Sequence, residues 1–201
     1  MTTEAAPRVV AYEHKVEGLG TMRIAAMDPD RDAALLHGWV TEERARFWGM
    51  GGMSLDAVHE IYAHMDTLTT HHAFLVHRDG EPVAVLQTYE PSEDRVSLCY
   101  QVEPGDIGMH LLVGPVAGAP EPGFTGRLIA GLVTYLFSDA SRKRIVVEPD
   151  AHNERAIARF ARSGFELGPE ITMPAIKLPD VHLPEKVARL AFLRRRDILS
   201  E

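Results

Sequence analysis

The sequence predicts an α/β (α+β) fold in which a mixed, mostly antiparallel central sheet is flanked by helices. Two apolar segments, residues 73–78 and 82–89, are joined by an Asp-Gly pair, which is typical of a tight β-hairpin. Farther along, the apolar pattern changes from the strand-like spacing of residues 107–114 to a helical spacing over residues 125–139. Residues 144–148 are almost continuously apolar, as expected of a strand in a sheet covered on both faces.

The first half of the chain contains one further predicted strand and two predicted helices. Residues 21–26 form the strand, and residues 31–41 form a helix whose apolar side chains recur on one face. Ser54 is a favourable N-cap for a second helix over residues 55–67. Trp48 and the glycines that follow it indicate a loop between the two helices.

The remaining elements complete a strand-and-helix alternation. Residues 95–101 are predicted to add a third strand to the antiparallel meander, and residues 171–178 a later one. A helix over residues 153–163 ends at Gly164, a residue type that tolerates the left-handed C-cap conformation. Residues 184–201 are predicted to form a basic amphipathic C-terminal helix.

Length and composition predict a single globular domain over residues 1–201, with an N-terminal extension at residues 1–20. The apolar share of 45% and the charged share of 25% are average for such proteins, and no repeat or linker divides the chain. The net charge of -8 argues against a nucleic-acid partner. The single cysteine, Cys99, cannot form an internal disulfide, and we expect it to be a small buried apolar side chain.

No segment has the apolar run of a signal peptide or of a membrane span. We therefore expect a cytoplasmic protein without a membrane partner. Ten histidines raise the alternative of a metal site. His59 and His64, however, are five residues apart, so they would lie about 140° apart around a helix, and the sequence contains no HExxH motif. We predict no metal.

A glycine-containing turn precedes the helix predicted over residues 125–139. The turn comprises Gly123, Phe124, Thr125 and Gly126. Because a helix N-terminus presents N–H donors and the positive end of the helix dipole, a pyrophosphate could bind here. The turn matches neither a P-loop nor the GxGxxG fingerprint, so an ordinary turn is the simpler interpretation of these residues taken alone.

Three segments carry a resemblance to a known family. Residues 105–110 contain the pattern D-x-G-x-H, residues 147–155 contain E-P-D-x-x-N, and the third segment combines Trp39 with Phe47-Trp48. Together with the order of elements over residues 21–178, these segments resemble the GNAT acyltransferases. Within that fold they resemble the siderophore-biosynthesis branch, whose members acylate hydroxylysine or hydroxylated diamines.

The resemblance implies a GNAT fold whose fourth and fifth strands splay apart to hold the pantetheine of an acyl-CoA co-substrate. By that match His110 corresponds to the catalytic histidine and Asp150 to its partner carboxylate. The implied cofactor-binding residues are Leu112, Val113, Gly123, Phe124, Thr125, Gly126, Arg127, Asn153 and Arg155. Family members usually carry a basic or amide residue before the glycines, where this chain has Glu121-Pro122, so Arg127 or Arg155 would supply the missing charge.

The chemistry of acyl transfer fits these assignments. Transfer from a thioester needs an uncharged nitrogen nucleophile, donors for the developing oxyanion and an acceptor for the released proton. Because histidine titrates near neutral pH, His110 would accept the proton, while Asp150 would orient the ring and stabilise its cationic form. The backbone N–H of Leu112 or Val113 would meet the oxyanion.

Four residues are candidates for the acceptor side of the site. The resemblance suggests that Trp48 walls this site, although a core or loop anchor is an equally good interpretation. Gln87 and Tyr89 alternate along a strand and so point to one side, where the family's acceptor pocket lies, but cross-strand packing explains them equally well. Glu148 lies two residues before Asp150 and could face the same side, which is unexpected for an apolar strand and favours a functional role.

These observations predict an acyl-CoA N-acyltransferase. We expect it to transfer an acetyl or succinyl group from acyl-CoA to the hydroxylated amine of N-hydroxycadaverine or N6-hydroxylysine, forming a hydroxamate for siderophore biosynthesis. Its expected partners are the small hydroxylated amine and a mono-oxygenase or siderophore synthetase of the same pathway. Two alternatives stay open: a protein or peptide N-acetyltransferase, and a non-catalytic acyl-CoA-binding module.

Overall fold

The structure is a computed structural model that describes residues 8–115, 118–177 and 182–198. It divides the chain into two compact units. The first comprises Met1–Leu86 and Leu111–Pro122, and the second comprises Gln87–His110 and Gly123–Glu201. The chain therefore passes between the units three times, after Leu86, after His110 and after Pro122.

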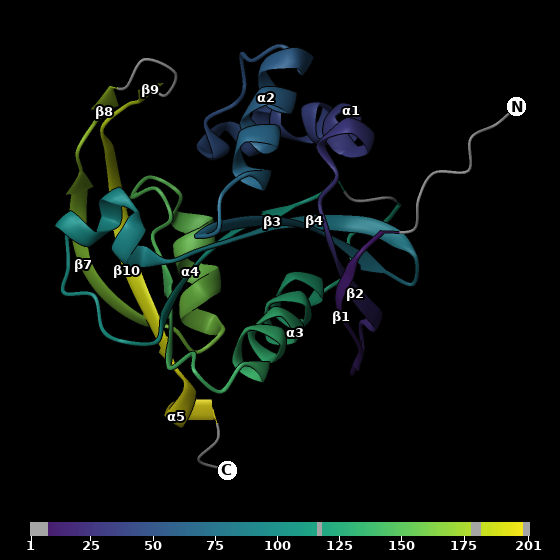
Figure 1. Cartoon of the computed structure of the whole chain (residues 1–201). Helices are drawn as coiled ribbons and strands as arrows, with labels where there is room; N and C mark the ends of the chain where they lie inside the picture. Colours follow the sequence, from purple (N-terminus) through teal and green to yellow (C-terminus); the bar gives the residue numbers. More distant parts are fainter. Residues whose placement is uncertain (1–7, 116–117, 178–181, 199–201) are drawn as a thin grey trace, which may run out of the picture. The chain divides into compact units, whose positions relative to one another are not determined.

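The sheet of the first unit has the strand order β1-β2-β3-β4 (Figure 1). The bounds are β1 Val10–Val16, β2 Gly20–Ala26, β3 His71–Arg78 and β4 Glu81–Tyr89. Strands β1 and β3 each pair with β2 in antiparallel ladders. The predicted strand at residues 21–26 and the two predicted hairpin strands are confirmed, whereas β1 lies in the segment predicted to be an extension.

The helices of the first unit are α1 (Pro29–Val40) and α2 (Leu55–Asp66), and each begins at a side-chain cap. The Asp28 carboxylate accepts a hydrogen bond from the backbone of α1, and the Ser54 hydroxyl accepts one from Ala57 N at 3.2 Å. The apolar faces of both helices pack into one core cluster with residues of β3 and β4. Both predicted helices are therefore confirmed, and a short 3-10 helix, η1 (Glu43–Trp48), follows α1.

The sheet of the second unit has the order β5-β6-β10-β7 (Figure 1). The bounds are β5 Asp106–Val113, β6 Arg144–Val147, β7 Glu166–Met173 and β10 Lys186–Arg194. Strand β10 is antiparallel to both β6 and β7, while β5 is parallel to β6. The short strands β8 (Ile176–Lys177) and β9 (His182–Leu183) pair separately. This mixed sheet confirms the predicted fold class.

Helix α3 (Phe124–Ser138) follows β5 along the chain, and α4 (Glu154–Arg162) follows β6 and lies beside β10 (Figure 1). A crossover helix is what a parallel pair such as β5 and β6 requires, because a tight turn cannot join parallel strands. After α4, Gly164 adopts φ +90°, as predicted for a left-handed C-cap. Within the described residues, every helix is too short or too polar to span a bilayer.

Strands β5 and β6 pair only at their beginnings. The described register joins Asp106 to Arg144, Ile107 to Ile145 and Gly108 to Val146. Strand β5 nevertheless continues to Val113, whereas β6 ends at Val147. Beyond Gly108 and Val146 the two strands therefore no longer pair with each other.

Two predicted elements are wrong. Residues 95–101 do not form a strand but contain the 3-10 helix η3 (Arg95–Leu98), which begins where the Asp94 side chain accepts a hydrogen bond from Val96 N. The predicted C-terminal helix is the strand β10, followed by the short helix α5 (Arg195–Ile198). Strand β10 lies between β6 and β7 in the sheet, and its consecutive residues Leu190 and Ala191 are both buried. Such an apolar run lacks strict alternation and cannot be distinguished from a helix by its spacing alone.

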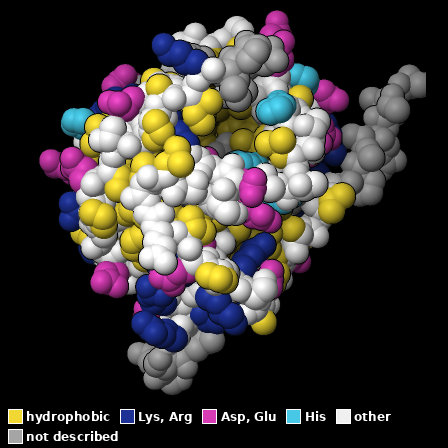
Figure 2. Space-filling view, turned by 60° about the vertical axis from the view of Figure 1, so that its left-hand side comes forward, with side chains coloured by type: hydrophobic (Ala, Val, Ile, Leu, Met, Phe, Trp, Pro, Cys, Tyr) yellow, Lys and Arg dark blue, Asp and Glu magenta, His cyan; other side chains and the backbone are white. Residues whose placement is uncertain are grey.

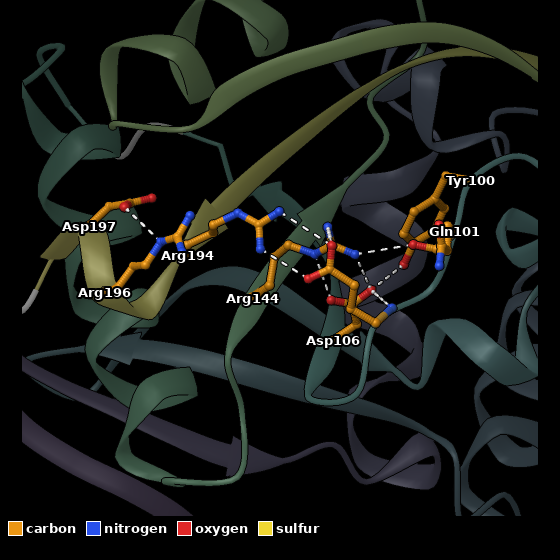
Figure 3. A network of polar contacts seen from close by, with 8 residues as sticks. Tyr100, Gln101, Asp106, Arg144, Arg194, Arg196 and Asp197 are labelled. Atoms are coloured by element: carbon orange, nitrogen blue, oxygen red, sulfur yellow. Dashed lines mark hydrogen bonds and ion pairs between the residues drawn. The ribbon is translucent and has the colours of Figure 1, made fainter.

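An ion-pair network holds the paired end of β5 and β6 (Figure 3). The buried Arg144 guanidinium donates to both carboxylate oxygens of Asp106 at 2.7 Å, and a further nitrogen donates to Glu103 at 2.7 Å. The Tyr100 hydroxyl donates to Asp106 at 2.9 Å. Because two-pronged guanidinium–carboxylate pairs are geometrically specific, this network fixes the register from which the rest of the site follows.

The arginine-rich end of β10 belongs to the same region. Figure 2 shows Lys and Arg side chains gathered at the lower edge of this face. Arg194 donates to Glu103 at 3.0 Å, Arg195 donates to the Phe137 carbonyl oxygen at 2.6 Å, and Arg196 lies 3.7 Å from Asp197. These partners explain the cluster as part of the fold.

Candidate active site

His110 and Glu148 meet just beyond the paired end of β5 and β6. Each lies two residues after a member of the last β5–β6 pair, which joins Gly108 to Val146. Since side chains two residues apart point to the same face, the register that pairs Gly108 with Val146 also brings His110 next to Glu148. The two side chains are in direct contact, with His110 Nε2 against Glu148 Oε1.

The Glu148 carboxylate is buried, and both of its oxygens have polar contacts. Its side chain is 3% exposed, whereas the His110 side chain is 35% exposed. The Tyr89 hydroxyl donates to Glu148 Oε2 at 2.7 Å, and the Lys186 ammonium lies 3.6 Å from Oε1. The site therefore combines a partly exposed imidazole with a carboxylate that is buried from solvent.

The charge state of the pair follows from these contacts. Burial acts to raise the pKa of Glu148, but the charge and hydrogen bond of His110, the charge of Lys186 and the Tyr89 hydroxyl act in the other direction. The net effect lowers the pKa of Glu148 from 4.5 to about 2. Burial, followed by the charge of Glu148, raises the pKa of Tyr89 well above 10.0. At neutral pH the carboxylate is therefore ionised and the tyrosine remains a donor.

The ionised carboxylate determines which ring nitrogen can take up a proton. A carboxylate only accepts hydrogen bonds, so His110 Nε2 must carry its hydrogen toward Glu148. The lone pair of a neutral imidazole is then on Nδ1. Nδ1 lies 3.3 Å from the side-chain oxygen position of Gln87, whose amide group can present either its oxygen or its NH₂ group to the ring. Nδ1 is thus the basic atom of this site.

The lowered pKa of Glu148 predicts a pH-dependent contribution to stability. A carboxyl group whose pKa is lower in the folded state stabilises the fold above its usual pKa of 4.5, and this contribution is lost as the pH falls toward about 2. We expect Glu148→Gln to lower Tm relative to the parent protein at pH 7, and the difference to shrink between pH 4.5 and pH 3. Calorimetry of both proteins across this range checks the prediction; a constant difference would contradict it.

Gly108 makes room for Tyr89. A Cβ at Gly108 would lie 2.1 Å from the Tyr89 ring, so any larger residue displaces the ring and with it the hydroxyl that donates to Glu148. We expect Gly108→Ala to destabilise the protein by about 1–3 kcal/mol, as overpacking typically does. Chemical denaturation measures this loss. Gly38→Ala is the matched control, because a Cβ at this helical glycine meets no atom within 4 Å and should leave stability equal or slightly higher.

The carboxylate predicted to orient His110 requires a correction. Asp150 accepts hydrogen bonds from His152, from the backbone N at 2.9 Å and from the ring Nδ1 at 3.1 Å. It follows Pro149, after β6 has ended, and its backbone bridges to Ala188 of β10. The carboxylate placed against the imidazole is Glu148, which the sequence analysis assigned to the acceptor side.

The glycine turn begins α3 without a side-chain cap. Gly123 adopts φ +81°, and the first turn of the helix carries no acidic residue. The Arg127 guanidinium lies 2.8 Å from where a Cβ of Gly123 would be, and Arg159 of α4 lies 3.9 Å from where a Cβ of Gly126 would be. The first N–H groups of a helix have no partner within the helix, so this end of α3 offers both hydrogen-bond donors and positive charge.

The other predicted cofactor residues have more varied surroundings. The Asn153 side chain caps α4 by accepting from Ala156 N at 3.2 Å, and Arg155 is exposed on the same helix. Arg159 of the same helix, rather than Arg155, approaches the glycine turn. The sequence analysis did not single out Arg159. Phe124 and Thr125 are partly buried residues at the start of α3.

Three predicted residues belong to the first unit. Leu112 is buried in its core, and the Val113 carbonyl oxygen accepts from Arg44 at 2.5 Å. Trp48 ends η1 and packs, partly buried, against the same core. Glu121, which stands where the family usually has a basic or amide residue, pairs with Arg78 at 2.5 Å.

Lys186 is the site residue that the sequence analysis missed. Its ammonium donates to the Glu148 carbonyl oxygen at 2.7 Å and lies 3.6 Å from the carboxylate. The sequence does not point to Lys186 as a site residue, because residues 184–201 are predicted to form a helix and a lysine at the start of a basic helix is ordinarily solvated. Within the described part of the chain, His, Cys, Asp and Glu side chains form no group of three or more suited to a metal ion.

Comparison with known proteins gives consistent matches. The family described as acetyltransferase (GNAT) domain matches residues 28–173. N(6)-hydroxylysine O-acetyltransferase of Escherichia coli is 31% identical over 196 residues, which cover 94% of this chain and 56% of that protein. N-hydroxyputrescine acetyltransferase of Acinetobacter baumannii is 28% identical over 130 residues, which cover 65% of this chain and 57% of that protein. The chain thus spans little more than half the length of these curated relatives.

A solved structure shares the fold. The crystal structure of the aminoglycoside acetyltransferase AAC(6')-Ib in complex with coenzyme A superimposes with a TM-score of 0.66 at 22% identity. The match covers 90% of this chain and 99% of that one.

Proposed function

Because this chain belongs to the GNAT acetyltransferase family, we propose that it is an acyl-CoA N-acyltransferase whose acceptor is a small hydroxylated amine. The proposed reaction transfers an acetyl or succinyl group to the hydroxylated nitrogen of N-hydroxycadaverine or N6-hydroxylysine and yields a hydroxamate. The names of two relatives, one acting on hydroxylysine and one on hydroxyputrescine, support an acceptor of this class.

The contact between His110 and Glu148 is the observation that carries the proposal. In the proposed step the acceptor nitrogen attacks the thioester carbonyl carbon, its proton passes to His110 Nδ1, and the carbon–sulfur bond breaks to release the thiolate. Glu148 stabilises the imidazolium that forms, and the proton then returns to the leaving sulfur. A hydroxylamine nitrogen is largely unprotonated at neutral pH, so this acceptor presents its lone pair without prior loss of a proton.

The start of α3 is the proposed binding site for the diphosphate of the acyl-CoA co-substrate. Its helix N-terminus and the guanidinium groups of Arg127 and Arg159 suit an anion of that charge. Arg127 is one of the two residues expected to supply the missing charge, and we include Arg159 in this proposed site beside Arg155.

A thiol-release assay tests the proposal. Acetyl-CoA and succinyl-CoA are each offered with N-hydroxycadaverine, N6-hydroxylysine, and the matched amines cadaverine and lysine that lack the hydroxyl group. We expect turnover with a hydroxylated acceptor and an at least tenfold lower kcat/KM with its matched amine. Equal rates on both, or turnover confined to peptide amines, would reject the hydroxylated-amine assignment.

The same assay separates the remaining alternatives. A peptide acetyltransferase would release thiol only with a peptide library as acceptor. A non-catalytic module would bind acyl-CoA in calorimetry without turnover on any acceptor. The proposal also includes a pathway partner, such as a mono-oxygenase or a siderophore synthetase, which pull-down experiments test. It includes a cytoplasmic location, where acyl-CoA is available, which cell fractionation tests.

A further inference from the structure

Lys186 shares one oxygen of Glu148 with the candidate base. Lys186 is the first residue of β10, and its side chain is 25% exposed. Its ammonium lies 3.6 Å from Glu148 Oε1, the same oxygen that contacts His110 Nε2. The other oxygen of the carboxylate is taken by the Tyr89 hydroxyl. A single buried negative charge therefore faces two groups that can be positive.

Electrostatics makes these two positive charges compete. With Lys186 in place, the carboxylate is already balanced, so a proton on His110 would give the cluster a net positive charge. Without Lys186, the imidazolium–carboxylate pair would be neutral and the protonated ring would be favoured. Charges about 4–6 Å from a titrating group typically change its proton affinity by one to three pKa units when buried, and by less when partly exposed.

Two further side chains that reach the site are uncharged. Gln87 and Tyr89 of β4 reach the site without charge, because the pKa of Tyr89 is raised well above 10.0 by burial and then by Glu148. Asp94 and Tyr100, from the segment between β4 and β5, act electrostatically on Tyr89. Within residues 8–115, 118–177 and 182–198, the ion pairs of the Glu148 carboxylate are with His110 and Lys186.

We propose that Lys186 is a positioning residue that keeps His110 in its neutral, proton-accepting form by competing with it for Glu148. The inference rests on the proposed function of the site, in which the imidazole must be neutral before it can take a proton. Lys186 also donates to the Glu148 carbonyl oxygen, which is a structural role. The pH dependence of the reaction distinguishes the two roles, because loss of a strand contact lowers stability without moving a titration.

The test compares Lys186→Met, Lys186→Arg and the parent protein in the thiol-release assay from pH 5 to pH 9. We expect the acidic limb of kcat/KM to move to higher pH by roughly 0.5 to 1 unit in Lys186→Met. The arginine variant keeps the charge and should retain the parent profile. Lys143→Met is the matched control, since Lys143 also donates to a backbone carbonyl oxygen, that of Ala140 at 2.8 Å.

A second measurement does not depend on turnover. The imidazole signals of histidine-labelled protein are followed by NMR over the same pH range, with His110→Gln identifying the His110 signal. Its titration midpoint should rise in Lys186→Met and stay in place in Lys186→Arg; Lys186→Gln replaces the methionine variant if that variant does not fold. An unmoved midpoint and an unmoved acidic limb overturn the inference. Absence of turnover on every acceptor, with the midpoint shift still present, rejects the proposed function instead.

Discussion

Replacing His110 by alanine is expected to lower kcat by roughly 10² to 10⁴-fold, the usual contribution of a general base. The KM for acyl-CoA should stay within about twofold, because the proposed diphosphate site at the start of α3 does not include this residue. Glu148 keeps Tyr89 and Lys186 as partners in the variant, so the buried carboxylate is not left without contacts. Steady-state thiol release at saturating acceptor measures both constants.

His152→Ala is the matched control for this experiment. His152 is also a histidine beside a carboxylate, that of Asp150, but its side chain is 82% exposed. We expect its kcat to equal that of the parent protein. A His110→Ala variant with the parental rate, at unchanged Tm, would remove the base from this position.

The second large effect separates the two acidic residues of the E-P-D motif. Glu148→Gln is expected to lower kcat by roughly 10²-fold or more, because the amide lacks the charge that stabilises the imidazolium and can hold the ring in the wrong tautomer. Asp150→Asn should change kcat by less than about threefold, since its side-chain oxygen can still accept from His152 N.

The comparison is direct because each substitution removes one negative charge, and the two positions are only two residues apart. Circular dichroism and Tm confirm that each variant folds. If Asp150→Asn abolished turnover while Glu148→Gln preserved it, the carboxylate inferred from the family resemblance would be right and the pair seen in the structure would be incidental.

Local patterns in the sequence were sufficient for most elements. The N-cap at Ser54, the Asp79-Gly80 turn and the glycine after α4 are short-range signals, and the helices and hairpin that they bound are confirmed. Strand β10 could not be identified in this way. It pairs with β6 on one side and β7 on the other, and this pairing with distant segments is a property of the sheet that the segment's own spacing does not report.

The site illustrates the same limit. The sequence indicated His110 and an acidic motif, but the choice between Glu148 and Asp150 depends on the β5–β6 register, which joins residues far apart in the chain. Asp106 and Arg144 are 38 residues apart in the sequence, as are His110 and Glu148. This equal spacing is the feature of the sequence from which the register can be predicted. A buried arginine at the start of an apolar strand demands a carboxylate partner, and pairing it with Asp106 would have aligned His110 with Glu148.

A double-mutant cycle tests the central claim, that His110 and Glu148 act as one catalytic unit. The kcat values of His110→Gln, Glu148→Gln and the combined variant are compared with that of the parent protein. Residues that act together are non-additive, so the combined variant should lose about as much activity as the more damaged single variant. If the two losses multiplied, the residues would contribute independently and the proposed pair would be contradicted.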